Sequence, residues 1–262
     1  MNLQMPADLG ATFRGPTQKA RVVTESWMAQ EGYCPSCLGR LSPMVGNFRA
    51  IDYECSQCRM PFQLKSTKSR IGNSVPDGAY ETMIQAIRSD RSPAFVLMRY
   101  DLLWWTVREL FVVPAFALTE QAILPRKPLA STARRAGWVG CNIALNRIAP
   151  DVKVPLVENG IALSRQDVCE RFVRLMPLRD ISVRQRGWAL AVLNGLQRAG
   201  WTTFTTNDAY KLETEVSRQF PGNRNIRPKI RQQLQVLRDM GILDHVQKGL
   251  WRIASRTPAG PI

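Results

Sequence analysis

The sequence predicts an α/β or α+β protein with a mixed sheet flanked by helices, an embedded four-cysteine cluster and a C-terminal winged helix-turn-helix. Three observations carry this prediction. Two Cys-x-x-Cys pairs lie near the N-terminus, and branched or aromatic residues over 94–100 and 109–113 are typical of strands. From about Ser182, three helical patterns precede a short hairpin. The expected divisions are a sheet-containing domain at 1–181, a winged helix at 182–256 and a disordered tail at 257–262.

The paired cysteines have the spacing of a single tetrahedral metal site. The pairs are Cys34 with Cys37 and Cys55 with Cys58, separated by residues 38–54. This arrangement suits one zinc ion in a structural role, because four thiolates leave no open position on the metal. A redox motif would not need two copies, and a reducing compartment favours metal over disulfides. Of the two remaining cysteines, Cys169 is expected in the core.

A candidate catalytic group surrounds the second cysteine pair. Asp52 lies just before that pair, and Gln63 and Lys65 lie just after it. In an extended strand side chains alternate, so Gln63 and Lys65 share one face while Phe62 and Leu64 point to the core. A carboxylate and an amide carbonyl can hold Mg²⁺, or Mn²⁺ in its place, and a lysine can steady an attacking hydroxide. The group suits phosphodiester hydrolysis; an ordinary polar strand is the alternative.

This group resembles the PD-(D/E)XK nuclease motif, with two departures. Ile51 stands where proline is usual, and Gln63 stands where glutamate is usual. A neutral amide holds Mg²⁺ less tightly than a carboxylate does. We expect Thr17 to cap a helix running to about Gln30, and in this fold a glutamate of the first helix often reaches the metal. Glu25 can therefore supply the missing charge, although an exposed helix glutamate is the equal alternative.

The charge balance points to a polyanionic partner. The 262 residues include 36 Lys+Arg and 21 Asp+Glu, for a formal net charge of +15 and a pI near 10.2. Nucleic acid is the commonest polyanion for such a chain, with ribosomal or membrane-surface binding as alternatives. The chain is long enough for one good core and a smaller domain.

Several function classes are excluded by what the sequence lacks. His245 is the only histidine, which removes His-Asn-His nucleases and Ser-His-Asp hydrolases. The longest apolar run, Leu110 to Leu118, contains Pro114 and falls short of the roughly 18 residues that span a bilayer. The N-terminus has no apolar signal core. We therefore expect a cytoplasmic protein that does not enter a membrane.

The middle of the chain is expected to alternate helices, turns and one basic loop. Residues 1–16 look like a loose arm, and Asp77 is expected to cap a second helix. Asn159-Gly160 predicts a hairpin turn, and Ser164 with Asp167 predicts a capping box. In the loop after residue 125, the candidate DNA-binding residues are Arg134, Arg135 and Trp138. A solvated basic loop is the alternative.

The C-terminal helices are expected over 184–199, 207–220 and 228–240. On the third helix the buried stripe of Ile230, Leu234 and Leu237 turns other side chains outward. The outward residues that can read a DNA groove are Arg231, Gln232 and Gln235, and Arg224 precedes them as a further DNA contact. Some winged helices bind proteins instead, but the charge of +15 favours DNA.

Blocks along nearly the whole chain resemble the DpnI-type methyl-directed type II restriction endonucleases. These blocks are Gln18 to Trp27, Tyr33 to Cys37, Leu64 to Ser66, Asp77 to Tyr80, Arg126 to Ala130, Thr132 to Trp138 and Ile230 to Gln235. The resemblance implies a PD-(D/E)XK domain with structural zinc and a winged helix, both reading methylated DNA. It implies Mg²⁺-dependent cleavage of double-stranded DNA at GATC carrying N6-methyladenine.

The resemblance also assigns individual residues. Asp52 and Lys65 match the catalytic aspartate and lysine of the family, Gln63 stands at its glutamate, and Trp138 matches the tryptophan of its methyl-sensing pocket. Two hypotheses remain: a methyl-dependent endonuclease, monomeric in solution, or a non-cleaving methyl-DNA binder in which Gln63 marks a decayed site. Retention of Asp52, Lys65 and Glu25 favours cleavage.

Overall fold

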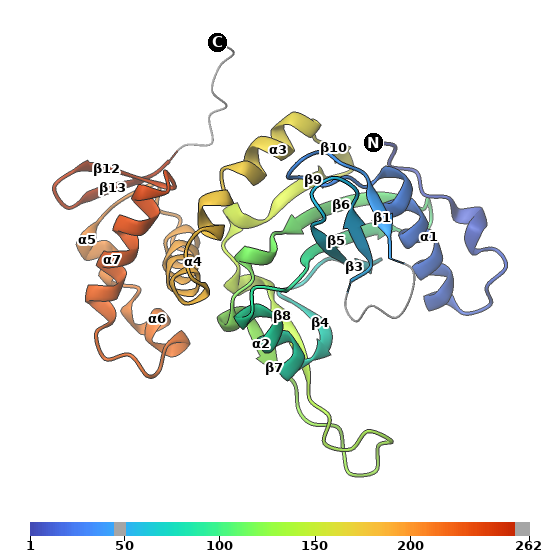
Figure 1. The fold of residues 1–262 in the computed structure, drawn as a ribbon, viewed down its shortest axis with the longest axis horizontal. Coiled ribbons are helices and arrows are strands. Elements are labelled where there is room, and N and C mark those ends of the chain that lie inside the picture. Colours follow the sequence, from blue (N-terminus) through green and yellow to red (C-terminus); the bar gives the residue numbers. More distant parts are fainter. Residues whose placement is uncertain (45–50, 255–262) are drawn as a thin grey trace.

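The structure, a computed structural model, describes residues 1–44 and 51–254. Its architecture is mixed α+β, with a sheet-containing N-terminal part and a helical C-terminal part that ends in a small hairpin (Figure 1). This confirms the predicted fold class. Residues 255–262, including the expected tail, lie outside the described residues. Within residues 1–44 and 51–254, every helix is too short or too polar to cross a membrane.

The N-terminal part is built on a seven-stranded mixed sheet with the order β1-β2-β3-β5-β6-β9-β10. The strands are β1 (Leu41–Pro43), β2 (Tyr53–Cys55), β3 (Pro61–Thr67), β5 (Ala94–Asp101), β6 (Thr106–Val113), β9 (Val154–Glu158) and β10 (Ile161–Ala162). Only the β3–β5 pair within this sheet is parallel. The first five residues of β5 are buried in succession, as expected for a strand covered on both faces. The two strands predicted over 94–100 and 109–113 are confirmed as β5 and β6.

A second, three-stranded sheet has the order β4-β8-β7. Its strands are β4 (Ser74–Ala79), β7 (Ile123–Pro125) and β8 (Gly140–Ala144). Residues 126–139 join β7 to β8 as a long loop that projects away from the body of the molecule (Figure 1). The small sheet was not predicted, because its strands come from distant parts of the chain.

Three α-helices accompany the sheets: α1 (Pro16–Glu31), α2 (Tyr80–Arg88) and α3 (Arg165–Val173). Pro16, rather than a cap at Thr17, opens α1, because a first-turn proline lacks only an N–H that has no helical partner. Asp77 does not cap α2; it lies inside β4, and α2 follows Ala79. The Ser164 cap of α3 is confirmed, since its side chain accepts from the Asp167 N–H at 3.0 Å.

Short turns of 3-10 helix fill the connections. They are η1 (Ala7–Gly10), η2 (Ala115–Ala117), η3 (Glu120–Ala122), η4 (Leu145–Arg147), η5 (Pro150–Val152) and η6 (Met176–Arg179).

The expected loose arm at residues 1–16 is wrong. Gln4 forms a bridge with Thr106 of β6, and Met5 is buried in the core. The hairpin predicted at Asn159-Gly160 is confirmed, with positive φ at both residues.

The C-terminal part is a helix-turn-helix region with a hairpin wing. Its elements are α4 (Val183–Arg198), β11 (Thr203–Thr205), α5 (Thr206–Tyr210), α6 (Glu213–Gln219), α7 (Ile226–Asp239), β12 (Leu243–Gln247) and β13 (Leu250–Ile253). The single helix expected over 207–220 is two helices, and Leu212 between them packs against Gly195 of α4. The third helix ends at Asp239, close to the expected end at 240, and Gly241, with φ of 70°, follows its C-cap Met240.

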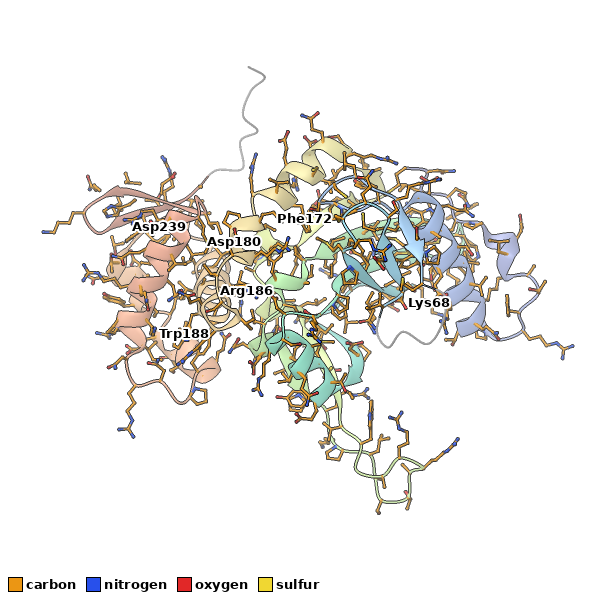
Figure 2. The ribbon with its side chains drawn as sticks, in the orientation of Figure 1. Lys68, Phe172, Asp180, Arg186, Trp188 and Asp239 are labelled. Carbon is orange, nitrogen blue, oxygen red and sulfur yellow. The ribbon has the colours of Figure 1, made fainter. Side chains whose placement is uncertain are left out.

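Helix α4 joins the two parts through direct polar contacts. The Arg186 guanidinium is 2.8 Å from the Asp90 carboxylate, and the Asn194 amide donates to the Asn146 carbonyl at 3.2 Å. Figure 2 labels Arg186 and Trp188 on this helix. Gly187 permits the close approach, since a Cβ there would lie 2.9 Å from the Gln121 side chain. The buried side chains of both parts consequently form one cluster.

Candidate functional site

The four paired cysteines converge on one point, as their spacing predicted. The sulfur atoms of Cys34, Cys37, Cys55 and Cys58 all lie within 4.8 Å of one another. Two of these separations are 3.4 Å and 3.6 Å, close to the about 3.8 Å edge of a tetrahedron with zinc–sulfur bonds of about 2.3 Å. The cluster could therefore hold a metal ion. Cys169 is different: it is only partly buried, so its expected place in the core is wrong.

Backbone geometry forms two matching turns around this cluster. Leu38 and Arg59, the residues after each pair, both have φ of 62° and donate backbone N–H groups to the carbonyls of Cys34 and Cys55. Gly39 has no room for a side chain, because a Cβ there would lie 2.9 Å from a cysteine sulfur. Burial acts to raise the pKa of all three thiols Cys34, Cys55 and Cys58, and it prevails at Cys34 and Cys58; at Cys55, hydrogen bonds from backbone N–H groups and neighbouring thiols outweigh it and lower the pKa to about 7. Thiolates are the form that binds metal.

Asp52 is held at the edge where β2 meets β3. Its backbone N–H donates to the Phe62 carbonyl at 2.9 Å, and its carboxylate accepts the Leu64 N–H at 2.8 Å. These two partners flank Gln63 in the chain. The cysteine cluster ties the same two strands together at Cys55 and Cys58. The four-cysteine cluster thus lies at the turn of the strand pair that carries Asp52 and Gln63.

The side chains of β3 alternate as predicted. Phe62 is buried, and Ser66 contacts Thr24 of α1 at 3.2 Å between hydroxyl oxygens. Gln63 and Lys65 point instead to β4 of the small sheet, because both contact Asp77 there. Gln63 is more enclosed than a polar strand residue of an open sheet, with 9% of its surface exposed. Strand β4 covers the face on which the candidate catalytic residues lie.

The two polar atoms of the Gln63 amide differ in hydrogen bonding, since Nε2 has a partner and Oε1 has none among the described residues. Its Nε2 lies 3.4 Å from Asp77 Oδ1. Its buried Oε1 has no hydrogen-bond partner within residues 1–44 and 51–254. Buried oxygens without a partner are rare, since leaving one unsatisfied is costly. A carbonyl oxygen in this state is suited to bind a hard cation such as Mg²⁺.

Asp77 is the residue that sequence reasoning missed at this site. Its Oδ1 lies 2.5 Å from Lys65 Nζ, and only 3% of its side chain is exposed. The sequence does contain a hint, because Asp77 is an acidic residue in an otherwise apolar and glycine-containing stretch. Its position just before a predicted helix, however, is typical of an N-cap. The pairing of Asp77 with Cys141 across β4 and β8 brings it to β3.

Glu25 lies close to this region without entering it. Its carboxylate pairs with Arg21 at 2.7 Å on the outer side of α1, and 37% of its side chain is exposed. Its backbone carbonyl accepts the Tyr53 hydroxyl at 2.8 Å, which places the residue beside the start of β2. Glu25 is therefore a neighbour of the strand pair, and its expected role as a metal ligand stays a prediction.

Comparison with known families gives one consistent result. Residues 1–181 match the family described as DpnI, the Dam-replacing family. Residues 184–253 match the family described as DpnI_C, the Dam-replacing HTH domain. The chain belongs to the DpnI Dam-replacing family. Membership in this family supports a methylation-dependent restriction endonuclease that acts on DNA.

The expected DNA-reading loop of this DpnI-family protein extends from the small sheet. Its two arms are held together at Leu129, whose N–H donates to the Trp138 carbonyl at 3.0 Å and whose carbonyl accepts the Gly137 N–H at 3.0 Å. Arg134 and Arg135 are exposed near the tip, and the Arg135 guanidinium stacks 5.0 Å from the ring centre of Trp138. The Trp138 ring also covers Gly140, where a Cβ would lie 2.8 Å away. The loop connects β7 to β8, and Asp77 lies in β4 of the same small sheet.

The third helix of the DpnI_C match shows the predicted division of faces. Ile230, Leu234 and Leu237 are fully buried. Their outward neighbours Arg231, Gln232 and Gln235 are exposed, as is Arg224 before the helix. The Lys229 ammonium contacts the Gln232 side chain at 2.9 Å on the same surface. This face carries the donors and acceptors that groove recognition requires.

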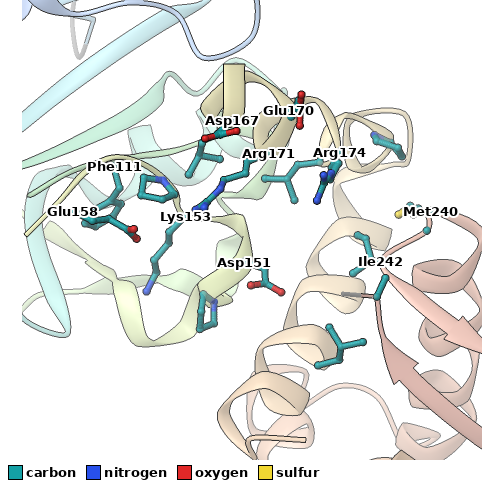
Figure 3. Close-up of a pocket in the computed structure, with 18 of the residues that line it drawn as sticks. Phe111, Asp151, Lys153, Glu158, Asp167, Glu170, Arg171, Arg174, Met240 and Ile242 are labelled. Carbon is teal, nitrogen blue, oxygen red and sulfur yellow. The ribbon is translucent and has the colours of Figure 1, made fainter. Parts of the chain in front are cut away.

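A cavity of about 1150 Å³ lies between β9, α3 and the wing, apart from both surfaces described above (Figure 3). Its acidic lining residues are Glu109, Asp151, Glu158, Asp167 and Glu170, against the basic Lys153, Arg171 and Arg174. Burial lowers the pKa of Lys153. An acidic excess disfavours a phosphate backbone, so this cavity is a poor candidate for the DNA-binding surface of a DpnI-family protein.

Proposed function

We propose that the protein is a type II endonuclease that hydrolyses double-stranded DNA at GATC sites carrying N6-methyladenine. The observation that carries the proposal is the buried, unsatisfied Oε1 of Gln63, on the same face of β3 as the Lys65 ammonium, while the Asp52 carboxylate is bound to the backbone N–H of the next residue, Leu64. A metal-dependent phosphodiester hydrolase needs oxygen ligands for its metal ion and a positively charged side chain near the phosphate. Family membership supplies the substrate class.

The donor set fits Mg²⁺, with Mn²⁺ as an alternative. Asp52 offers a carboxylate and Gln63 offers a carbonyl oxygen that lacks a protein partner. When bound, the ion supplies a polarised phosphate and an activated water. Asp52 and Gln63 orient that ion, and Lys65 provides a positive charge for the phosphate oxygens. Hydrolysis then adds hydroxide to phosphorus and returns a proton to the departing sugar oxygen.

The cysteine cluster fits zinc in a structural role. Four thiolates complete the tetrahedron, so no position is left for a substrate. The ion would hold the turns after Cys37 and Cys58, and with them the pairing of β2 and β3. We assign methyl recognition to Trp138, a half-buried aromatic side chain of the long loop, and to the outward face of α7, which presents groove-reading residue types on an exposed surface.

The proposed cleavage can be tested with plasmid DNA that is methylated or unmethylated at GATC, in Mg²⁺, with the ends mapped. We expect cleavage of the methylated form only. Asp52→Asn and Lys65→Ala should each lower the rate by at least about a hundredfold, with DNA affinity nearly intact. Lys68→Ala is the matched control, since Lys68 is an exposed lysine of the loop that follows β3.

The same experiment separates cleavage from binding alone. Protein that retains methylated DNA in a gel shift but releases no cut product with Mg²⁺ or Mn²⁺ would be a methyl-DNA binder. Equal loss of rate in Lys65→Ala and Lys68→Ala would mean that lysine charge matters only for DNA affinity. Either result contradicts the proposed role of this site.

A further inference from the structure

Asp52, Gln63 and Lys65 together carry too little negative charge for a divalent-cation site. Asp52 contributes one negative charge, whereas Gln63 is neutral and Lys65 is positive. Divalent cations such as Mg²⁺ bind through hard, preferably anionic oxygens. Glu25 is not enclosed with these groups in this structure, because 37% of its side chain is exposed and its carboxylate is paired with Arg21. A second carboxylate must come from another element.

Asp77 meets this requirement by position. It comes from β4, which faces β3, and its side chain is 97% buried, since 3% is exposed. A carboxylate is costly to bury unless charges or hydrogen bonds compensate it. Its compensation here is the Lys65 ammonium at 2.5 Å, with the Gln63 amide at 3.4 Å. The acid is thus enclosed among the candidate catalytic groups rather than displayed on the surface.

Gln63 gives the second, independent observation. The residue is nine-tenths buried, and its Oε1 has no partner among the described residues. The Nε2 of the same planar amide points to Asp77, so the carbonyl oxygen and the Asp77 carboxylate share one face of β3. A purely structural Lys65–Asp77 ion pair would leave this oxygen unexplained. A cation bound on this face of β3 would satisfy it.

We propose that Asp77 is a ligand of the divalent cation and supplies from β4 the negative charge that Gln63 lacks on β3. Asp52, Gln63 and Asp77 together then offer two carboxylates and one carbonyl oxygen. The cation replaces Lys65 as the counter-charge of Asp77, which leaves the ammonium to the substrate phosphate. Gln63 is consequently a working member of the site rather than a mark of decay. This inference rests on the proposed nuclease function.

The test measures metal binding directly. Zinc-loaded, full-length protein is titrated with Mn²⁺, and the free ion is followed by electron paramagnetic resonance in the absence of DNA. Asp77→Asn keeps the shape of the side chain while removing its charge, and should weaken Mn²⁺ binding at least tenfold. Asp101→Asn is the matched control, because Asp101 is likewise a strand aspartate paired with a basic side chain, Arg108, but it lies at the end of β5 and, among the described residues, its carboxylate bonds to none of the candidate catalytic residues. It should leave the affinity unchanged.

A compensating change sharpens the result. Gln63→Glu added to Asp77→Asn should restore Mn²⁺ affinity to within about threefold of the wild type, since the carboxylate returns to the same face. A structural ion pair predicts the opposite. In that case Asp77→Asn would lower the melting temperature, keep Mn²⁺ affinity within twofold, and gain nothing from Gln63→Glu.

The outcomes distinguish this inference from the function on which it rests. Wild-type protein that cuts methylated DNA while Asp77→Asn binds Mn²⁺ normally would overturn the role of Asp77 alone. Wild-type protein that binds Mn²⁺ through Asp77 but never cuts DNA would overturn the nuclease function alone. Wild-type protein that binds no Mn²⁺ would overturn the cation site and Asp77 with it.

Discussion

Polar side chains are shielded from solvent where β3 faces β4, whereas they are exposed to solvent on α7. Gln63 and its partner Asp77 are enclosed, with exposed fractions of 9% for the residue and 3% for the side chain. Arg231 and Gln235 on α7 project from an exposed face over a fully buried stripe. The first region encloses its polar groups between two sheets, and the second holds them out to solvent.

The difference follows from what each region must do. Charge development at a phosphate is best stabilised by groups that are already fixed and shielded from water. Base edges in a DNA groove lie several ångströms from the protein surface, so long exposed side chains must reach them. Changes in the enclosed region should therefore switch an activity off. Changes on the exposed face should weaken recognition by degrees.

The largest effect is expected from the cluster that holds the enclosed region together. Cys55→Ser removes a fully buried ligand of the four-sulfur site. Structural zinc contributes about 10–16 kcal/mol in small zinc domains, which is comparable with the about 5–15 kcal/mol stability of a typical protein. We expect loss of zinc and of the β2–β3 pairing, measured by elemental analysis and by thermal unfolding.

The matched control for this change is Cys169→Ser, at a partly buried cysteine outside the cluster. It should keep its zinc and its melting temperature. A Cys55→Ser protein that unfolds at the wild-type temperature would show that the cluster is not a structural metal site. Stoichiometric zinc in both variants would lead to the same conclusion.

The next effect concerns methyl selectivity, which we assign to the 126–139 loop of the small sheet as well as to α7. Burial of one methyl group contributes about 0.8 kcal/mol, roughly a fourfold preference, whereas fit in a shaped pocket reaches about 1–3 kcal/mol. Trp138→Ala should therefore lower the ratio of methylated to unmethylated cleavage by about tenfold or more. Nonspecific affinity should change little, because Arg134 and Arg135 remain.

Trp104→Ala provides the comparison for this loop. Trp104 is 65% exposed in the turn between β5 and β6, away from β8. It should leave the cleavage ratio unchanged. If Trp138→Ala keeps the wild-type ratio, the methyl group is read by α7 alone. The measurement is initial cleavage rate on paired plasmids that differ only in methylation.

The two regions also differ in how much of them the sequence predicted. The face of α7 follows from local periodicity, and Gly241 ends the helix by local backbone preference. Gln63 and Lys65 sharing a face likewise follows from strand alternation. These features depend on residues close in sequence, so pattern reasoning reaches them. The same holds for the spacing of the cysteine pairs.

The enclosure of the catalytic region could not be predicted in this way. Asp77 enters the site because β4 pairs with β8, and its partner Cys141 is remote in the chain. An aspartate before a helix fits a cap locally, and only the long-range pairing makes it a strand residue. The packing of Leu212, between α5 and α6, against Gly195 of α4 is likewise a contact between residues that are not close in sequence.

The smallest effect is expected on the exposed face, where Arg231→Ala removes one groove-reading side chain. A bidentate arginine–guanine contact contributes about 1–3 kcal/mol of discrimination, so binding to methylated GATC should weaken by about fivefold to a hundredfold. Arg238→Ala is the matched control on the same helix, because Arg238 pairs with Asp239 at the C-terminal end. Fluorescence anisotropy at two salt concentrations measures both variants.

Salt dependence decides what Arg231 contacts. If it reads a base, the loss should be confined to GATC-containing DNA, and the slope of log affinity against log salt should stay nearly constant. If it contacts a phosphate, affinity should fall equally for all sequences and the slope should decrease by about one. An Arg231→Ala protein that matches Arg238→Ala in both respects would remove α7 from the DNA interface. Sequence recognition would then have to lie in the 126–139 loop, on the same sheet as Asp77.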